Sequence, residues 1–355
     1  MVQNNIAVIR GDGIGIEVVE EGIKVLKAVS ENYDFELSFN EYPWSSKFYI
    51  DTGAMMPSDG LDILSNYDAI FLGAVGHPDI QDHITLNGLL LPIRRKFDQY
   101  VCERPSVLFD GIESPLSGKK PFDIDMVVIR ENTEGEYANV GGFQYMDFPE
   151  EVGIQTGVFT RKGCERVIRY SFELARRRNK KKHLTSITKS NAQGYGMLVW
   201  DRAFERISAE YPDISTDSLL VDAAAMDFIR KPEFFDVVVA SNLFGDILTD
   251  IAAIITGSMG LASSANLDPE GRYPSMFEPV HGSAPDIMGK GIANPMAQIL
   301  TGAMLLRHLG HEDAATDIEK AVLSVLSEGE ILTPDLYGSS TTSSVGDAIV
   351  SALGK

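Results

Sequence analysis

The order of hydrophobic and polar positions predicts alternating strands and helices along the first part of the chain. Residues 6–11 form a short apolar run that favours a strand, and residues 15–32 carry apolar side chains at helical spacing. Residues 35–42 have the pattern of a second strand. Residues 67–76 form an apolar run that ends in glycine, which is typical of a strand buried on both faces.

The same alternation continues toward the C-terminus. Residues 87–100 have a helical pattern, with Pro92 expected near an end or a kink. Further buried strands are predicted at 123–132, 183–191, 218–225 and 235–242. The last helix is expected at 346–355, capped by a loop over 340–347. Strands that alternate with helices indicate an α/β protein with a largely parallel sheet.

Length and composition narrow the class of protein. The 355 residues suffice for about two domains, and 44% hydrophobic with 23% charged residues is typical of a globular chain. No apolar run approaches the ~20 residues that span a bilayer, and the N-terminus lacks a signal-peptide pattern. We therefore expect a cytoplasmic protein without a membrane partner. Cys102 and Cys164 are the two cysteines, too few for a disulfide framework or a cysteine metal site.

Charge argues against nucleic acid as a partner. The formal net charge is -20, whereas phosphate binding needs a basic field. Residues 176–183 (RRRNKKKH) are the exception, and their position after an amphipathic segment favours a helix C-terminus, where cations complement the dipole. If many of the acidic residues converge on one site, a cation is the expected partner.

One acidic pair is a candidate metal site. A buried strand leads into Ser241 and Asn242, both good helix N-caps, and Asp246 and Asp250 follow four residues apart. On a helix they share a face, with Cβ atoms ~5–6 Å apart. Their apolar neighbours suggest that the pair is shielded from solvent, so that Mg²⁺ or Mn²⁺ would relieve the repulsion. The spacing alone equally fits two exposed acids on an ordinary helix.

Other candidate residues are informative only together. Arg94, Arg104 and Arg130 each stand near the end of a predicted element, and arginine forks match carboxylates, so the three would suit a dicarboxylate. Singly, each fits an ordinary surface residue. Lys189 ends a predicted strand, where α/β active sites gather, and Tyr137 lies in the segment IRENTEGEYANV. Both are weak signals when taken alone.

The segment Gly11–Gly15 (GDGIG) lies between the first strand and the first helix. Its spacing is Gly-x-Gly-x-Gly, which differs from the Gly-x-Gly-x-x-Gly of a dinucleotide fingerprint, and it lacks the lysine and hydroxyl of a P-loop. It therefore does not by itself predict a phosphate cradle.

Several long motifs in order identify a family resemblance. GDGIG, RENTEGEY, NLFGDILTDIAAIITGSMGL and EPVHGSAPDIMGKGIANP resemble the isocitrate/isopropylmalate dehydrogenase family of β-decarboxylating dehydrogenases, from about residue 6 to 350. DHITLNGLLLPIRRKFDQYV and TKSN are most similar to its tartrate and D-malate dehydrogenase branch. The resemblance implies an isopropylmalate dehydrogenase-like two-domain fold with a large mixed, mostly parallel sheet, not a Rossmann fold. Residues 1–99 plus 257–355 would form a large cofactor-binding domain. Residues 100–256 would form a small domain with substrate and metal residues and the dimer interface.

The resemblance also assigns roles to the residues singled out above. It implies Asp246 and Asp250 as metal ligands together with Asp222 from the partner subunit of a homodimer that shares its active sites. Arg94, Arg104 and Arg130 match the substrate-carboxylate clamp. Tyr137 matches the general acid, and Lys189, which also crosses from the partner, matches the residue that relays a proton with Asp222.

The cofactor is expected at a distant loop. Gly282, Ser283 and Ala284 are small enough to let backbone approach a pyrophosphate, and Asp286 could bind a ribose 2′-hydroxyl while repelling a 2′-phosphate, which favours NAD. NADP-using relatives carry Lys-Tyr where this chain has Asp286 and Ile287. By resemblance, Asn294 contacts adenine and His281 contacts the cofactor rather than acting in catalysis. Gly11–Gly15 would form a tight turn at the edge of this cleft.

The implied reaction is oxidative decarboxylation of a 2-hydroxy dicarboxylate, with Mn²⁺ or Mg²⁺, NAD and K⁺ as a further candidate ion. D-malate, giving pyruvate and CO₂, is the favoured substrate, and tartrate is a further one. The alternative is 3-isopropylmalate dehydrogenase of leucine biosynthesis, because Leu90 could pack an isopropyl group, worth ~1–3 kcal/mol. Asn87 departs from both branches, which carry glutamate or tryptophan there. A catalytically inactive regulatory homologue would lack a metal aspartate, Lys189 or Tyr137, and all are present.

Overall fold

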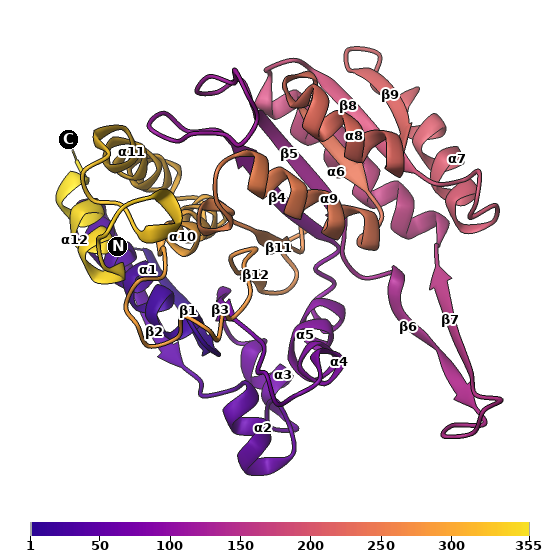
Figure 1. Cartoon of the computed structure of the whole chain (residues 1–355), viewed down its shortest axis with the longest axis horizontal. Coiled ribbons are helices and arrows are strands. Elements are labelled where there is room, and N and C mark those ends of the chain that lie inside the picture. The colour runs from indigo at the N-terminus through magenta and orange to yellow at the C-terminus, as the bar shows by residue number, and fades with distance from the viewer. Residues whose placement is uncertain (1, 355) are drawn as a thin grey trace. The chain divides into compact units, whose positions relative to one another are not determined.

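The chain folds into two compact units, and a strand that is buried along its whole length lies in each. The computed structural model describes residues 2–354 (Figure 1). The first unit comprises Met1–Gln99, Arg104–Ile124 and Ala252–Lys355, and the second comprises Tyr100–Glu103 and Asp125–Ile251. The predicted domain boundaries differ from these units at residues 104–124 and 252–256, which the structure assigns to the first unit.

The first unit contains a mixed sheet. Strand β1 (Val2–Gly11) pairs in parallel with β2 (Phe35–Glu41) and β3 (Ala69–Ala74), and β3 pairs in parallel with β12 (Ser275–Phe277). Strand β11 (Ala265–Leu267) is antiparallel to β12, so the order is β2-β1-β3-β12-β11. Every residue of β3 is buried, as its continuous apolar run predicts.

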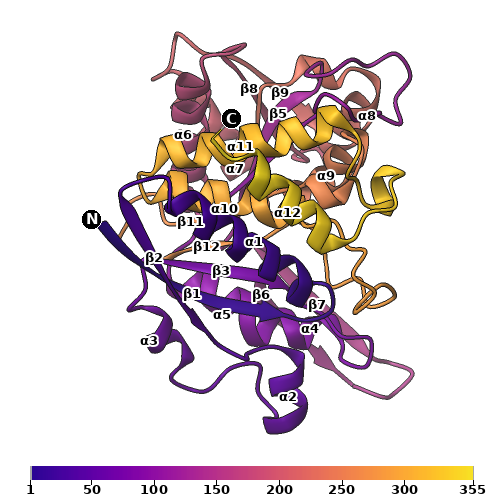
Figure 2. The same ribbon diagram turned by 90° about the vertical axis from the view of Figure 1, so that its left-hand side faces the viewer.

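Four long helices of the first unit pack together beside this sheet (Figure 2). They are α1 (Gly15–Ser30), α10 (Met296–His308), α11 (Glu312–Glu328) and α12 (Thr342–Ala352). The buried residues of α1 include Val18, Leu26 and Val29, which lie on the apolar stripe seen in the sequence. The shorter elements are α2 (Ser46–Thr52), α3 (Gly60–Leu64), α4 (Asp82–Thr85), the π-helix η1 (Leu86–Leu90), α5 (Leu91–Lys96), η3 (Met259–Leu261) and η4 (Pro334–Leu336).

The second unit has parallel strands in the order β5-β10-β8-β9. These are β5 (Asp125–Glu131), β8 (His183–Thr188), β9 (Ser215–Leu220) and β10 (Val237–Ala240). Its helices are α6 (Arg161–Arg178), α7 (Gly196–Ser208), α8 (Val221–Arg230) and the short η2 (Pro232–Phe234). Strand β4 (Val101–Val107) and helix α9 (Asn242–Ile255) contribute residues to both units. The predicted class, an α/β protein with a mixed and mostly parallel sheet, is confirmed.

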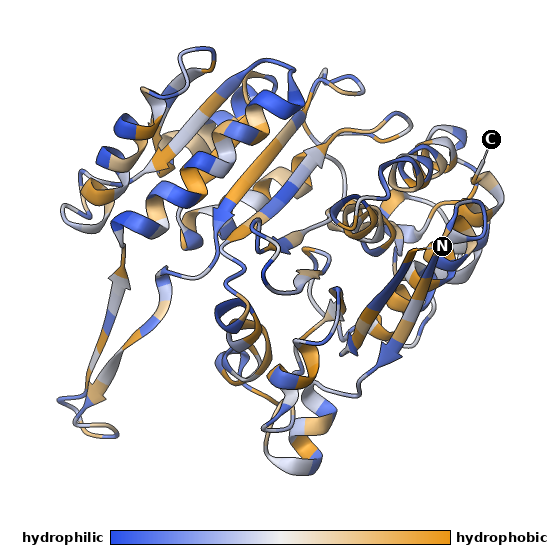
Figure 3. Ribbon diagram, turned by 180° about the vertical axis from the view of Figure 1, so that it is seen from behind, coloured by the Kyte–Doolittle hydropathy of each residue, from blue (hydrophilic) through white to orange (hydrophobic). Residues whose placement is uncertain are grey.

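A two-stranded antiparallel arm extends from the second unit. It consists of β6 (Gly135–Gln144) and β7 (Val152–Val158), which the sequence patterns do not predict (Figure 1). Large apolar side chains on it are exposed, among them Phe143 and Phe148 at 66% each. Figure 3 shows hydrophobic stretches along its strands.

Several predicted element bounds differ from the structure, among them those of the strand expected at 218–225 and of the last helix. The strand expected at 218–225 ends at Leu220, and α8 starts at Val221, so Asp222 lies in the first turn of a helix, where a carboxylate complements the dipole. The last helix starts at Thr342 rather than 346, because Thr341 Oγ1 accepts a hydrogen bond from Ser344 N at 3.1 Å and caps it there.

The basic run ends a helix, as predicted. Helix α6 closes with Arg176, Arg177 and Arg178. Arg176 pairs with Asp213 at 2.5 Å, and Arg178 pairs with Asp125 at 2.8 Å, so these cations are engaged by carboxylates of their own unit. Within the described part of the chain, no helix combines the length and apolar character needed to cross a membrane.

Candidate functional site

The end of β5 and the start of α9 bring together charged residues of the second unit. Arg130, 3% exposed, donates from Nε and Nη2 to Asn242 Oδ1 at 3.0 and 2.7 Å. Its Nη1 forms an ion pair with Asp246. A Cβ at Gly245 would lie 2.6 Å from Arg130 Cβ, so this glycine permits the helix to approach the strand. Sequence reasoning treated Asn242 only as a capping residue and missed its contact with Arg130.

Tyr137 joins this cluster from β6. Its hydroxyl donates to Asp246 Oδ2 at 3.1 Å, and the Arg130 guanidinium lies 5.2 Å from the centroid of its ring. Asp250 follows one helical turn after Asp246 and is exposed, whereas the Asp246 side chain is 35% exposed. The expectation that apolar neighbours shield the pair is therefore wrong within one chain, because Leu248 and Ala252 face the core while Asp250 faces solvent.

Lys189 and Asp222 form a second charged pair in the same unit. Lys189 follows β8, and its Nζ donates to Asp222 Oδ1 at 2.5 Å. This hydrogen bond lowers the pKa of the Asp222 carboxyl below its usual range. Residues 2–354 contain no group of three or more His, Cys, Asp or Glu side chains arranged to hold a metal, so Asp222 does not complete a site with Asp246 and Asp250 of its own chain.

Two of the predicted substrate arginines belong to the first unit. Arg94, at the end of α5, is buried, and its Nη2 donates to Glu278 Oε1 at 2.7 Å. Glu278 also accepts from Asn266 Nδ2 at 2.8 Å. Arg104, on β4, is buried as well. Sequence reasoning did not find Glu278, although it opens the motif EPVHGSAPD.

The two residues expected to influence the choice of substrate, Asn87 and Leu90, lie outside regular α-helix. Asn87 and Leu90 lie in the π-helix η1, a conformation that occurs frequently at functional sites. Asn87 is exposed, and its Nδ2 donates to His83 O at 2.7 Å. Leu90 is 7% exposed and belongs to a core cluster with Trp44 and Met55. Pro92 is at the start of α5, as expected.

The predicted cofactor loop lies entirely within the first unit. Ser283 is buried, Gly282 and Asp286 are exposed, and Ala284 adopts a left-handed φ of 39°. Ile287 packs against a small apolar cluster that contains Ile14 and Val18. The backbone of the loop is therefore accessible at Gly282, while the side chain of Ile287 anchors the loop to the core of the first unit.

His281 and Asn294 flank this loop. His281 Nδ1 is 3.0 Å from Gly282 O, while its Nε2 is buried without a hydrogen-bond partner, and burial lowers the pKa of the imidazole. Asn294 Nδ2 donates to Asp335 Oδ2 at 3.0 Å. The contact with Asp335 was not anticipated, because 41 residues separate the two.

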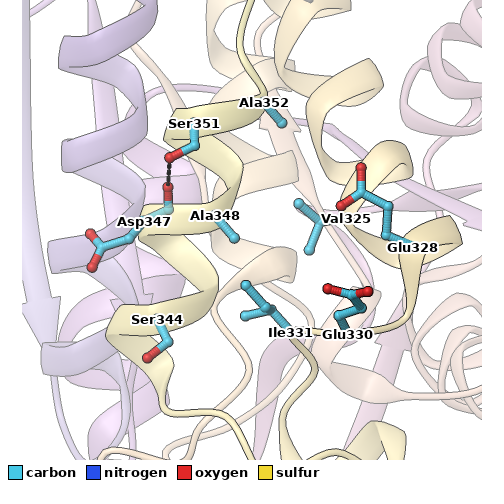
Figure 4. A pocket seen from close by; sticks show the side chains of 9 residues that line it. All are labelled: Val325, Glu328, Glu330, Ile331, Ser344, Asp347, Ala348, Ser351 and Ala352. Atoms are coloured by element: carbon cyan, nitrogen blue, oxygen red, sulfur yellow. Dashed lines mark hydrogen bonds between the residues drawn. The ribbon is translucent and has the colours of Figure 1, made fainter.

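A separate cavity of about 430 Å³ lies between α11 and α12 (Figure 4). Apolar side chains of Val325 and Ile331 line it together with the carboxylates of Glu328 and Glu330. None of the residues predicted to bind substrate, metal or cofactor contributes to its walls.

Comparisons with known proteins cover the whole chain. Residues 5–349 match the isocitrate/isopropylmalate dehydrogenase family. The chain is 52% identical to D-malate dehydrogenase (decarboxylating) of Escherichia coli K12, over 97% of each chain. It is 49% identical to a probable tartrate dehydrogenase/decarboxylase of Agrobacterium vitis, over 99% of this chain and 98% of the relative.

The fold of a solved structure supports the same family relationship. Isocitrate dehydrogenase from Methylococcus capsulatus superimposes with a TM-score of 0.89 at 36% identity, covering 99% of this chain and 100% of that one. Shared sequence over the full length and a shared fold point to the same group of enzymes, and the chain therefore belongs to the isocitrate/isopropylmalate dehydrogenase family.

Proposed function

We propose that this protein catalyses the metal- and NAD-dependent oxidative decarboxylation of D-malate to pyruvate and CO₂, with tartrate as a further substrate. The observation that carries the proposal is the cluster in which Arg130 and Tyr137 both contact Asp246, with Asp250 one turn away. It combines a carboxylate-binding cation, a proton donor and cation-binding oxygens. The names of the relatives supply the substrate class.

Three arginines are assigned to the substrate carboxylates. Arg94, Arg104 and Arg130 are all buried, which makes their guanidinium groups rigid and strong partners for a dianionic ligand. In this structure Arg94 is held by Glu278 and Arg130 by Asn242. These contacts fix the orientation of each guanidinium.

The carboxylates of α9 fit a divalent cation. Asp246 and Asp250 offer oxygen ligands on one helix face, and oxygen is the ligand type that Mg²⁺ and Mn²⁺ prefer. Asp222 of a second copy would supply the third carboxylate. When bound, the cation would polarise the substrate hydroxyl and the later keto oxygen, while NAD would accept the hydride. We propose Mn²⁺ or Mg²⁺, with K⁺ as a further candidate ion.

Proton movements are assigned to two pairs of side chains. Lys189 would take the proton from the substrate hydroxyl, and Asp222, hydrogen-bonded to it at 2.5 Å, would pass that proton on. Tyr137 would protonate the carbon from which CO₂ leaves. Its hydroxyl already donates to Asp246 at 3.1 Å, which orients the O–H group beside the proposed cation site.

The loop from His281 to Asn294 is assigned to NAD. Gly282 offers backbone without an obstructing side chain, and no atom lies within 4 Å of the position a Cβ would occupy there. The unpartnered Nε2 of His281 is free to accept a hydrogen bond from the cofactor. Asp286 would bind the adenosine ribose and repel a 2′-phosphate.

A homodimer would complete the active site. Asp222 lies on α8, which also exposes Met226 and Ile229, and Ile247 beside Asp246 is 50% exposed on α9. Apolar side chains next to the site residues support a second copy as the partner of this surface. The exposed Phe143, Phe148 and Ile154 of the β6–β7 arm offer a further surface for the same partner.

Steady-state kinetics with Mn²⁺ and NAD⁺ test the proposal. Comparing kcat/KM for D-malate, L- and meso-tartrate and 3-isopropylmalate should rank D-malate first, because Leu90, which would pack an isopropyl group, is instead packed in the core. Isopropylmalate ahead by about tenfold, or 1.4 kcal/mol of transition-state binding, would contradict the substrate assignment. A protein inactive on all four acids would contradict the reaction.

A further inference from the structure

The turn between β1 and α1 and the first turn of α1 each hold the loop 281–294 at one point. Ile14 N donates to Ser283 O at 2.9 Å, and Glu17 Oε1 accepts from Gly289 N at 2.6 Å. The two bonds bracket the residues from Ala284 to Met288. Asp286, the residue assigned to the adenosine ribose, lies between them.

The backbone of the turn at Gly13 lies directly against the loop. Gly13 has a φ of +57°, and a Cβ there would lie 1.9 Å from Ser283 O, so any side chain at this position would displace the loop. Ile14 packs in an apolar cluster with Ala284, Ile287 and Ala293. The loop is thus seated on the turn by apolar contact as well as by hydrogen bonds.

Asp12 fixes the turn to two other segments of the first unit through hydrogen bonds. It is 8% exposed and accepts hydrogen bonds from both hydroxyls of the Ser45-Ser46 pair, from Ser46 N at 3.1 Å and from Gly76 N at 2.9 Å. A buried carboxylate surrounded by donors anchors three segments of the first unit to one another.

The side chain of Glu17 accepts a hydrogen bond from the backbone of the loop. Its Oε1 binds Gly289, and its Oε2 is buried without a hydrogen-bond partner. An unpartnered buried carboxylate oxygen carries a cost in stability. The hydrogen bond of the other oxygen goes to the loop, so the position of the loop is what this side chain fixes.

We propose that Glu17 is a positioning residue for dinucleotide binding, which fixes the Gly289 end of the loop and thereby Asp286. The inference rests on the proposed assignment of this loop to NAD. A hydrogen bond to a charged group orders the free loop, so its loss should weaken the binding of NAD⁺ by about tenfold. The turnover number should stay unchanged, because Glu17 contacts none of the residues assigned to chemistry.

Calorimetric titration of the full-length protein with NAD⁺ and with ADP-ribose tests this. Glu17→Ala should raise the Kd for both ligands by the same factor, because both carry the adenosine end, and should raise KM for NAD⁺ without lowering kcat. Amide hydrogen exchange in the ligand-free protein should accelerate around Gly289. Glu17→Gln, which keeps an oxygen for Gly289 N, should restore most of the affinity.

Matched controls separate positioning from stability. Asp317→Ala removes a carboxylate that accepts from Gly354 N at 3.1 Å, the same kind of bond away from the loop. It should lower Tm by a similar amount and leave both Kd values unchanged. If Glu17→Ala does not fold, Gly13→Ala is compared with Gly271→Ala, which has a similar φ of +63° but open space around its Cβ. The first alone should weaken NAD⁺ binding.

The outcomes are distinguishable. A wild-type protein that binds neither NAD⁺ nor ADP-ribose would overturn both the assignment of the loop and the role of Glu17. A wild-type protein that binds both, with equal Kd values in Glu17→Ala and Asp317→Ala, would overturn the role of Glu17 alone. Equal losses in the two glycine variants would overturn the support of the loop by the turn before α1, and with it the positioning of the loop on which the role of Glu17 depends.

Discussion

The two candidate regions of this molecule are built in different ways. The loop assigned to NAD draws its shape from backbone groups and small residues, and the contacts that hold it all come from the first unit. The cluster around Asp246 is built from charged side chains of the second unit that neutralise one another. The first region is assembled within one chain, whereas the second presents two of its three proposed metal ligands together.

This difference predicts how each region responds to substitution. A loop that is held by several weak contacts loses affinity in steps, because each contact contributes little. A cluster of coupled charges loses its function when one member is removed, because the remaining charges are left uncompensated. The predictions below run from the largest expected effect to the smallest.

Asp246→Asn should reduce turnover by about 10³-fold or more, because metal-ion catalysis contributes several kcal/mol to the transition state. NAD⁺ binding, measured by calorimetry, should remain. Glu210→Gln, which breaks an exposed ion pair with Arg169 in the same unit, is the control and should retain activity. Near-normal turnover in Asp246→Asn would refute the ligand assignment.

Mixing two inactive variants extends this test to the shared site. Refolding Asp246→Asn together with Asp222→Asn should restore about a quarter of wild-type activity, because half of the dimers are mixed and each mixed dimer contains one intact site. A mixture as inactive as its components would argue that both aspartates serve the same subunit.

Asp286→Lys should shift the ratio of kcat/KM for NADP⁺ over NAD⁺ by about tenfold or more, because a cation replaces a carboxylate beside the expected 2′-phosphate. Glu330→Lys makes the same change of charge at the cavity between α11 and α12 and should leave the ratio unaltered. An equal shift in both variants would indicate a general effect of net charge rather than a contact at Asp286.

The smallest effect concerns stability against acid in the first unit. Although His308 is exposed at the surface, its packing against Phe277 removes part of the imidazole from water and lowers its pKa, with the more modest opposing influence of Asp268. His308 therefore binds a proton more readily in the unfolded chain than in the folded protein. As pH falls from about 6.5, the pKa of an unperturbed histidine, through the lower pKa of folded His308, protonation favours the unfolded chain and the folded protein loses stability. Thermal unfolding of His308→Phe should show a weaker decrease of Tm between pH 7 and pH 5 than wild type. Identical slopes would contradict the assignment of this pH dependence to His308.

Local pattern predicted much of the fold. The apolar run over 67–76 gave β3, the amphipathic run over 15–32 gave α1, and the run of basic residues marks the end of α6. The errors fall where apolar residues do not distinguish strand from helix, as at 218–225. The arm of β6 and β7 was missed because its exposed apolar side chains follow no periodicity that a core would impose.

The candidate site was predicted mainly by resemblance rather than by spacing. Asp246 and Asp250 share a helix face, which their spacing alone indicates, and the family prediction is confirmed over residues 5–349. The partners that orient the charged residues could not be predicted, because Glu278 is 184 residues from Arg94 and Asn242 is 112 residues from Arg130. Such contacts depend on how the strands are ordered in a sheet.

The sequence by itself determined several buried strands, the amphipathic helix α1 and the types of chemical group that this protein carries, because hydrophobic periodicity and residue chemistry are local properties. The tertiary structure decided what the segment GDGIG does. Its spacing does not predict a phosphate cradle, and in the structure Gly13 lies against Ser283, Asp12 accepts hydrogen bonds from Ser46 and Gly76, and Glu17, two residues after the segment, accepts one from Gly289. Only the packing of segments up to 272 residues apart turns this short stretch into a support for a distant loop.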